Sequence, residues 1–280
     1  IGHNNYPTMD VNVVFFNLRT LTIQSSATSD RLYNQSGGGG ISLSVGYYKQ
    51  SGSGNQTFNV PIGVDGNQVA FSAQSGNTTF SSNFYINSNV AVFEGNGNFN
   101  LTGVALGDGG AITKNGTGTL TLSNTNTYTG LTTINGGVLH LSNSNGSTLP
   151  TTNDISINEN GTLKISSNQT INVLNLNGGV IDIDAGISLI VQNLNFTSGS
   201  IVGLGNLITT PNIVSQLTTS GTVGYSFNYT INADYTPSSY AAIGLPAGLS
   251  INTTTGVISG TPTQAGVFNV EISATNAVGT

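Results

Sequence analysis

The chain has 280 residues, of which 36% are hydrophobic and only 6% are charged, and its net charge is −6. The apolar share supports a folded core and excludes charge-driven disorder, while the abundance of Asn, Thr, Ser, Gly and β-branched residues excludes a mainly helical protein. Five basic residues are too few for the clustered Lys and Arg that nucleic acid or an anionic membrane requires. We therefore expect an all-β protein.

Cysteine usage and hydropathy bear on where the protein works. The chain has no cysteine, which excludes disulfide scaffolds and cysteine-ligated zinc and suits a bacterial protein that crosses an envelope unfolded. It contains no run of 18 apolar residues that could span a bilayer. Residues 1–10 lack the basic and apolar regions of a signal peptide, as expected of a mature or trimmed chain. We expect a secreted or cell-surface protein without membrane insertion.

The first strand-like run extends from Val11 to Ile23. Its stretch Val13–Phe16 is apolar on both faces, so both faces of such a strand need to be covered. We assign residues 1–23 to an N-terminal strand that caps the following solenoid. The alternative is that this strand is donated to a neighbouring subunit, and the candidate assembly residues are then Val11, Val13, Val14, Phe15, Phe16 and Leu18.

Some residues that carry binding chemistry in other proteins have a simpler interpretation here. Gly37–Gly40 is followed by no Lys-Ser/Thr pair and no helical pattern, so it is a turn and not a phosphate-binding loop. His3 and His140 are too isolated to form a metal site, and we expect no metal and no cofactor. Four tyrosines are either sugar-stacking platforms or ordinary half-buried strand residues, namely Tyr47, Tyr48, Tyr235 and Tyr240.

An internal repeat occupies the middle of the chain. Four period-2 strands, each preceded directly by a glycine, begin at Thr119, Val138, Thr162 and Val180, with separations of 19, 24 and 18 residues. Shorter strand-like pieces and Asn-Gly or Gly-Gly turns lie between them. This spacing is typical of the coils of a β-solenoid, in which outward Asn, Ser and Thr form hydrogen-bonded ladders along the stack. We assign residues 24–210 to the solenoid.

One coil resembles a known repeat family. Gly116–Ser123, followed by Asn126–Leu139, is similar to the passenger-associated transport repeat of autotransporter-like surface proteins, over about residues 110–142. Looser copies extend the similarity over roughly residues 90–208. The resemblance implies a right-handed parallel β-helix displayed at or beyond a bacterial surface.

A different pattern begins at Pro211. Tyr225–Ile231 alternates aromatic and polar residues like a half-buried antiparallel strand. Gly244–Asn252, Gly256–Pro262 and Ala265–Asn276 then resemble the immunoglobulin-like domains found in tandem on bacterial surface proteins, which implies a β-sandwich over residues 211–280. In that family one more strand normally follows the segment resembling Val267–Asn276, so residues 211–280 would leave an unpaired edge and an open apolar groove. Either the last strand lies in sequence beyond residue 280, or a strand of another subunit completes the sandwich.

The middle positions of the four repeat strands form one candidate ladder on the outer surface, Thr121, His140, Lys164 and Asp182, with Asp184 nearby. One interpretation is a catalytic cluster with Asp182 as the base and Lys164 polarising a substrate carboxylate. The simpler interpretation is an exposed pair of Lys164 and Asp182 on adjacent coils. Ice binding through Thr119 and Thr121 is disfavoured, because His140, Lys164 and Asp182 follow Thr121 and interrupt the hydroxyl array.

Together these patterns predict a β-solenoid followed by an immunoglobulin-like β-sandwich. We expect a non-enzymatic extracellular protein that acts as an adhesin or as the subunit of a surface fibre, filament or matrix. Its partners would be further copies of itself, another surface protein or glycans. The alternative is a β-helix that binds or cleaves polysaccharide.

Overall fold

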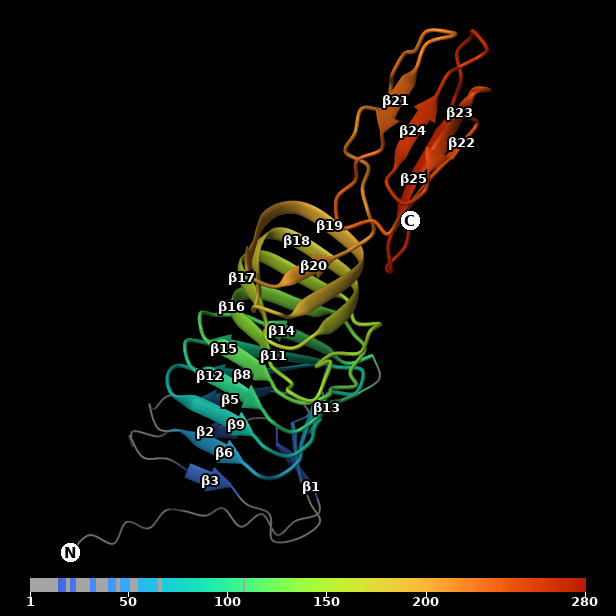
Figure 1. Cartoon of the computed structure of the whole chain (residues 1–280). Coiled ribbons are helices and arrows are strands. Elements are labelled where there is room, and N and C mark those ends of the chain that lie inside the picture. Colours follow the sequence, from blue (N-terminus) through green and yellow to red (C-terminus); the bar gives the residue numbers. More distant parts are fainter. Residues whose placement is uncertain are drawn as a thin grey trace, which may run out of the picture. The chain divides into compact units, whose positions relative to one another are not determined.

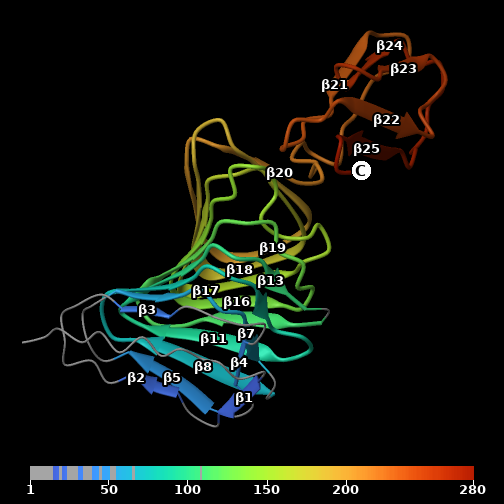
Figure 2. The same ribbon diagram turned by 90° about the horizontal axis from the view of Figure 1, so that it is seen from below.

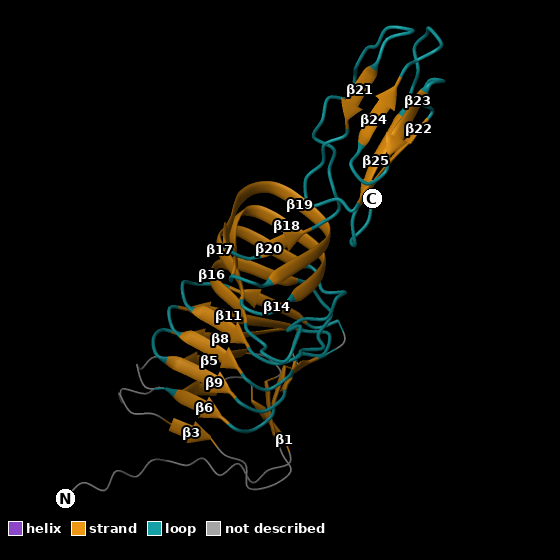
Figure 3. Ribbon diagram, viewed as in Figure 1, coloured by secondary structure: helices purple, strands orange, loops and turns teal. Residues whose placement is uncertain are grey.

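The structure, a computed structural model, describes residues 15–18, 21–23, 31–33, 40–43, 46–50, 55–64, 67–107 and 109–280 (Figure 1). Side chains are described from residue 55 onward, apart from that of Leu106. Every regular element in these residues is a β-strand (Figure 3), which confirms the all-β prediction. The chain divides into two compact units, residues 1–189 with 194–206 and residues 190–193 with 207–280, and each is described by itself.

The first unit is a β-solenoid built from short strands. Its first coils contain β1 (Phe15–Leu18), β2 (Leu21–Ile23), β3 (Arg31–Tyr33), β4 (Gly40–Leu43), β5 (Gly46–Gln50), β6 (Gln56–Phe58), β7 (Ile62–Val64), β8 (Gln68–Ala73), β9 (Asn77–Phe80), β10 (Phe84–Tyr85), β11 (Val90–Gly95), β12 (Asn98–Leu101), β13 (Ala105–Leu106), β14 (Ala111–Lys114) and β15 (Thr119–Leu122). The later coils contain β16 (Thr132–Leu141), β17 (Ile155–Ile165), β18 (Gln169–Ile183) and β19 (Ser188–Gly203), and β20 (Asn206–Ile208) follows.

The pairing order shows how the coils stack (Figure 2). Every third strand pairs with the next in a parallel ladder, so that β1, β4, β7, β10 and β13 form one sheet. Strands β2, β5, β8, β11 and β14 form a second ladder, and strands β3, β6, β9, β12 and β15 form a third. Each of these coils therefore contributes one strand to each of three faces. From β16 onward, the second and third strands of a coil merge, because β16 pairs with both β14 and β15.

The first described strands pair with the strands of the following coil. Phe15–Leu18 pairs with Gly40–Leu43, and Leu21–Ile23 pairs with Tyr48–Gln50, so β1 and β2 belong to the first coil. These two strands lie within the segment 1–23 that the sequence assigns to the N-terminal end of the solenoid. Val11, Val13 and Val14 lie outside the described residues.

The core consists of columns of inward side chains that run through successive coils. Leu120, Leu139, Leu163 and Ile181 occupy one column in register, and each is 0% exposed. In the earlier coils the core is aromatic, and the rings of Phe58 and Phe80 stack with centroids 5.3 Å apart. Burying these columns against the neighbouring coil supplies the hydrophobic free energy that no single coil can provide alone.

Glycine is required where the chain turns between faces. Gly137 has φ +64°, and a Cβ atom added there would lie 2.4 Å from the carbonyl oxygen of Gly118 on the preceding coil. Any larger residue at this corner would force the coils apart. This close approach explains why a glycine precedes the outward-inward alternation of the strand.

The second unit contains two small antiparallel sheets. One has the order β21 (Phe227–Thr230), β24 (Val257–Gly260) and β23 (Leu249–Asn252), and the other pairs β22 (Ser239–Ile243) with β25 (Glu271–Thr275). Two facing antiparallel sheets are the expected arrangement of an immunoglobulin-like sandwich. The predicted fold class, a β-solenoid with an immunoglobulin-like domain, is the one observed.

Candidate functional site

The register of the solenoid places the predicted ladder residues side by side. Thr121 pairs with His140, His140 with Lys164, and Lys164 with Asp182. Each is half-buried, whereas the residues on either side of it in its strand point into the core and are buried. The order along the stack is the one expected from the period-2 strands, and the ladder faces outward.

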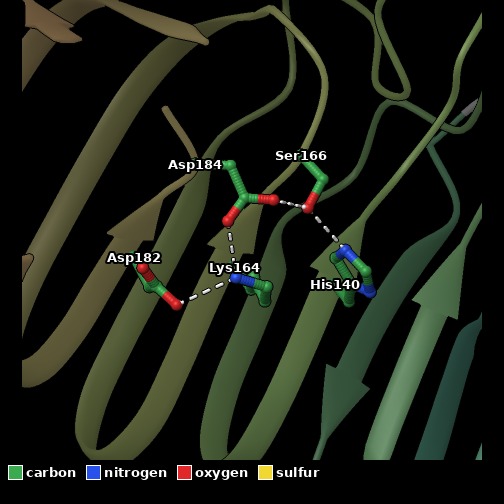
Figure 4. Close-up of polar contacts among 5 residues, drawn as sticks. All are labelled: His140, Lys164, Ser166, Asp182 and Asp184. Atoms are coloured by element: carbon green, nitrogen blue, oxygen red, sulfur yellow. Dashed lines mark hydrogen bonds and ion pairs between the residues drawn. The ribbon is translucent and has the colours of Figure 1, made fainter. Parts of the chain in front are cut away.

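Five side chains on this face form one connected group (Figure 4), which we call the Lys164 cluster: His140, Lys164, Ser166, Asp182 and Asp184. The ammonium of Lys164 donates to Asp182 Oδ2 at 3.0 Å and to Asp184 Oδ1 at 2.7 Å. The hydroxyl of Ser166 donates to Asp184 Oδ2 at 2.5 Å. His140 Nε2 lies 2.8 Å from Ser166 Oγ.

The hydrogen bonds determine which way the protons point. Ser166 has one hydroxyl proton, and it is directed at the carboxylate of Asp184, which only accepts when ionised. His140 must therefore carry a proton on Nε2 and donate it to Ser166 Oγ. In a nucleophilic site the serine donates to the imidazole, so the order here is the reverse of the one that activates a serine.

The charges of the cluster stabilise one another. Hydrogen bonds to Asp184 and Asp182 raise the pKa of Lys164, and hydrogen bonds from Lys164 and Ser166 lower the pKa of Asp184. Burial, followed by the nearby charge of Lys164, lowers the pKa of His140. At neutral pH the cluster thus combines a protonated lysine, an ionised Asp184 and a neutral imidazole. None of the three shifts brings a pKa closer to 7, as a general acid active at that pH would require.

Sequence reasoning missed one member of the cluster and placed another at its edge. Ser166 follows Lys164 by two residues, so the period-2 alternation that placed Lys164 outward also predicts Ser166 outward. Asp184 was expected near the ladder, but its contact with Lys164 is the shorter of the two ion pairs.

The remaining candidates do not join this cluster. His3 and Gly37–Gly39 lie outside the described residues, as do the side chains of Tyr47 and Tyr48. Tyr235 and Tyr240 are half-buried in the second unit, and burial raises the pKa of Tyr235. Among the residues that the structure describes, no three His, Cys, Asp or Glu side chains gather as a metal site, and no helix is long and apolar enough to cross a membrane.

Amide ladders connect neighbouring coils elsewhere on the surface. Asn135 Nδ2 donates to Asn115 Oδ1 at 2.9 Å, and Asn158 Nδ2 donates to Asn135 Oδ1 at 2.6 Å. Asn177 Nδ2 continues the series to Asn158 Oδ1 at 3.5 Å. These bonds confirm the prediction that uncharged polar side chains form ladders along the stack.

An apolar groove opens in the second unit, and we call it the module groove. Its volume is about 890 Å³, and its lining includes Phe227, Leu249, Ile258, Val270 and Ile272. Residues of β21, β23 and β24 line it together with Ile272 of β25, and no residue of β22 takes part. Among the described strands β25 pairs only with β22, so its other edge is unpaired.

The module groove is open to solvent. Leu217 and Val267 line it and are 78% and 98% exposed. Within residues 207–280, the buried apolar side chains are those of Ile231, Ile258, Pro262 and Ala274. Exposed apolar surface beside an unpaired strand edge is a typical binding site for another strand.

Comparison with known families agrees with this architecture. Residues 112–141 match the family described as passenger-associated-transport-repeat, and residues 208–280 match the one described as putative Ig domain. No curated protein and no solved structure matches the chain. The repeat, the immunoglobulin-like domain and the stacked coils together fit an autotransporter-like passenger with a β-helix.

Proposed function

We propose that the protein is an extracellular, non-enzymatic structural protein of bacteria that acts as an adhesin or as the subunit of a surface fibre or matrix. The observation that carries the proposal is the pairing within the Lys164 cluster, in which Lys164 donates hydrogen bonds to Asp182 and Asp184, and Ser166 donates one to Asp184. The amide ladders support it as well, because they stabilise a long stack of coils without charge.

The chemistry of the cluster supports a structural role. A catalytic base needs a free lone pair near the substrate, and a catalytic acid needs a pKa close to the working pH. Asp184 instead accepts from both Lys164 and Ser166, and these bonds lower its pKa. The ion pairs lie at the surface, with side-chain exposures of 32% for Lys164 and 43% for Asp184, so they act as exposed cross-strand pairs.

The second candidate function is cleavage of polysaccharide by the same face, because two carboxylates and an imidazole gather there (Figure 4). The discriminating experiment incubates purified protein with neutral and acidic polysaccharides and measures new reducing ends and unsaturated products. We expect neither product. Turnover that disappears in Asp182→Asn and persists in Thr162→Val, a substitution at a neighbouring outward position, would refute the non-enzymatic proposal.

Adhesion is tested on whole cells. Bacteria that display residues 1–280 on their surface are compared with bacteria that display an unrelated β-solenoid at equal density, for attachment to abiotic surfaces, to host cells and to one another. The proposal expects more attachment from the first strain. Equal attachment on all three surfaces, together with monomers in solution, would contradict it.

Self-association into a fibre is the finer part of the proposal, and the module groove supports it. A strand from another molecule would pair with the free edge of β25 and cover the exposed apolar lining. If the donated strand is residues 11–18, the first coil has to open, because Phe15–Leu18 pairs with β4 in its own chain. Head-to-tail donation of this kind produces a filament.

Negative-stain images and sedimentation of the purified chain test the assembly. We expect filaments that are lost in Val267→Asp, which places a charge in the groove. A deletion of residues 1–14, which leaves β1 in place, tests the donor separately. Filaments of unchanged length in both variants would show that neither the groove nor this segment holds subunits together.

A further inference from the structure

A regular array of uncharged polar side chains covers one outer face of the early coils. Each coil contributes three outward positions at β6, β9, β12 or β15. Because these strands pair in register, each position lies beside the equivalent one of the next coil, and the positions form three rows along the stack, which we call files. We call this array the polar grid. Its members are Asn55, Thr57 and Asn59, then Asn77, Thr79 and Ser81, then Asn98, Asn100 and Thr102, and finally Thr119, Thr121 and Ser123.

Every position of the polar grid carries a hydroxyl or an amide, and none carries a charge or an apolar side chain. All are half-buried or exposed, while the residues between them are buried. The grid ends at β16, where Val138 and His140 take the positions next to Thr119 and Thr121. The interruption after Thr121 that the sequence shows is therefore one border of the array, which continues in the other direction through Asn100, Thr79 and Thr57.

In the outer two files, the side chain of every member except Thr119 is held by a bond between coils. Asn77 Nδ2 donates to Asn55 Oδ1 at 3.1 Å, and Asn98 Nδ2 donates to Asn77 Oδ1 at 3.1 Å. On the opposite file, the hydroxyls of Ser81 and Ser123 donate to carbonyl oxygens of the preceding coil. These side chains have already lost their rotamer freedom, so a ligand that binds them pays little further entropy.

The middle file differs from its neighbours. The side chains of Thr57, Thr79, Asn100 and Thr121 make no hydrogen bond to any residue that the structure describes. Each can both donate and accept. The grid thus presents a row of available hydrogen-bonding groups between two rigid rows.

The dimensions follow from sheet geometry. Neighbouring coils are about 4.8 Å apart, and successive outward residues on one strand are about 6.6 Å apart. The grid therefore covers roughly 14 Å along the stack and about 13 Å across it. Such a surface matches a partner with hydrogen-bonding groups that repeat at short intervals and carry no charge.

We propose that the polar grid binds a neutral polysaccharide, whose hydroxyls donate and accept along the whole chain. The inference rests on the proposed adhesin function and names its ligand class. An anionic polymer is disfavoured because no basic side chain lies in the grid. The lysine nearest along the ladder, Lys164, is already paired with two carboxylates.

The test measures retention of the purified full chain on microcrystalline cellulose and chitin, with polygalacturonate as the anionic comparison. We expect retention on at least one neutral polymer, unchanged in 1 M NaCl because no charge takes part. Retention on polygalacturonate alone, abolished by salt, would overturn the proposal. Ice shaping or thermal hysteresis without polysaccharide retention would overturn it as well, in favour of an ordered-water ligand.

A matched pair of variants assigns the binding to the grid. The double substitution Thr57→Val and Thr79→Val removes two adjacent hydroxyls of the middle file and keeps β-branched side chains. The control, Thr113→Val with Thr133→Val, makes the same change at two adjacent outward positions of β14 and β16. The first should weaken binding at least about fivefold, as expected for the loss of two hydrogen bonds, and the second less than about twofold.

Equal effects of the two double variants would place the binding elsewhere and refute the assignment. Melting temperatures of both are compared with that of the unchanged chain, so that loss of fold is not mistaken for loss of binding. If the unchanged chain binds no neutral polymer, this inference fails, while the cell-attachment experiment still decides whether the protein is an adhesin.

Discussion

The substitution of Leu163 by aspartate tests the assignment of inward and outward faces. Leu163 is 0% exposed and lies between Leu139 and Ile181 in the core column. Truncating a buried leucine costs about 2–5 kcal/mol, and an unpaired buried charge adds several kcal/mol more. Because domains are stabilised by only about 5–15 kcal/mol, Leu163→Asp should unfold the coils around β17.

The neighbouring residue provides the matched control. Lys164 is the next residue in the same strand, but it points outward and its side chain is 32% exposed. Lys164→Ala removes two surface ion pairs, and its cost should stay below about 1 kcal/mol for each pair. Thermal and urea unfolding followed by circular dichroism measure both variants. Equal shifts in the unfolding midpoint would show that the inward and outward faces are reversed.

Three further predictions concern buried or paired groups. Burial lowers the pKa of Lys114 from 10.5 to about 8, so between these pH values the unfolded chain binds more protons than the folded chain. The free energy of unfolding should therefore rise from pH 8 to 10.5. Lys114→Met should abolish this rise, as measured by thermal unfolding at several pH values. Gln169→Leu leaves the backbone N–H groups of Thr148 and Leu149 without their acceptor, and it should lower the free energy of unfolding in urea by about 2–4 kcal/mol. The control, Asn177→Leu on an exposed amide ladder, should lower it by less than about 1 kcal/mol. The pKa of His140 is lower in the folded chain than the usual 6.5, so as pH falls through about 6.5 the imidazole is protonated in the unfolded chain before it is in the folded chain. The free energy of unfolding should therefore decrease below that pH. An NMR titration of the imidazole in the folded protein should show a midpoint under 6.5.

The repeat strands were predictable because two signals agree in them. A glycine precedes each strand and the apolar residues alternate, so inward Leu139 and outward His140 were assigned correctly before any register was known. The merging of two strands into β16 was not predictable, because Gly136 and Gly137 look like a turn between separate strands. In the structure the backbone pairs on both sides of this corner.

The early coils illustrate what local patterns lack. Strands β6 and β9 carry Phe58, Thr78 and Phe80 at the inward positions that leucine and isoleucine occupy in the later coils, so the repeat is visible only from about residue 90 onward. Their alignment depends on coils of slightly different length that stack in register, which is a tertiary property. For the same reason the polar grid was not found from the sequence, and the hydroxyl array was followed only toward His140. The extent of the module groove likewise depends on how two sheets pack, which a single strand cannot show.

The regular pairing of each coil with the next has a consequence for how the fold forms. Thr119 pairs with Val138, and Thr162 pairs with Val180, across 19 and 18 residues of chain. Closing a loop of this length costs little more entropy than closing a short one, and the cost is the same for each new coil. A completed coil presents a straight template edge on which the next segment can align. Folding can therefore advance along the chain one coil at a time, and only the segment at the growing end exposes its apolar residues at any moment.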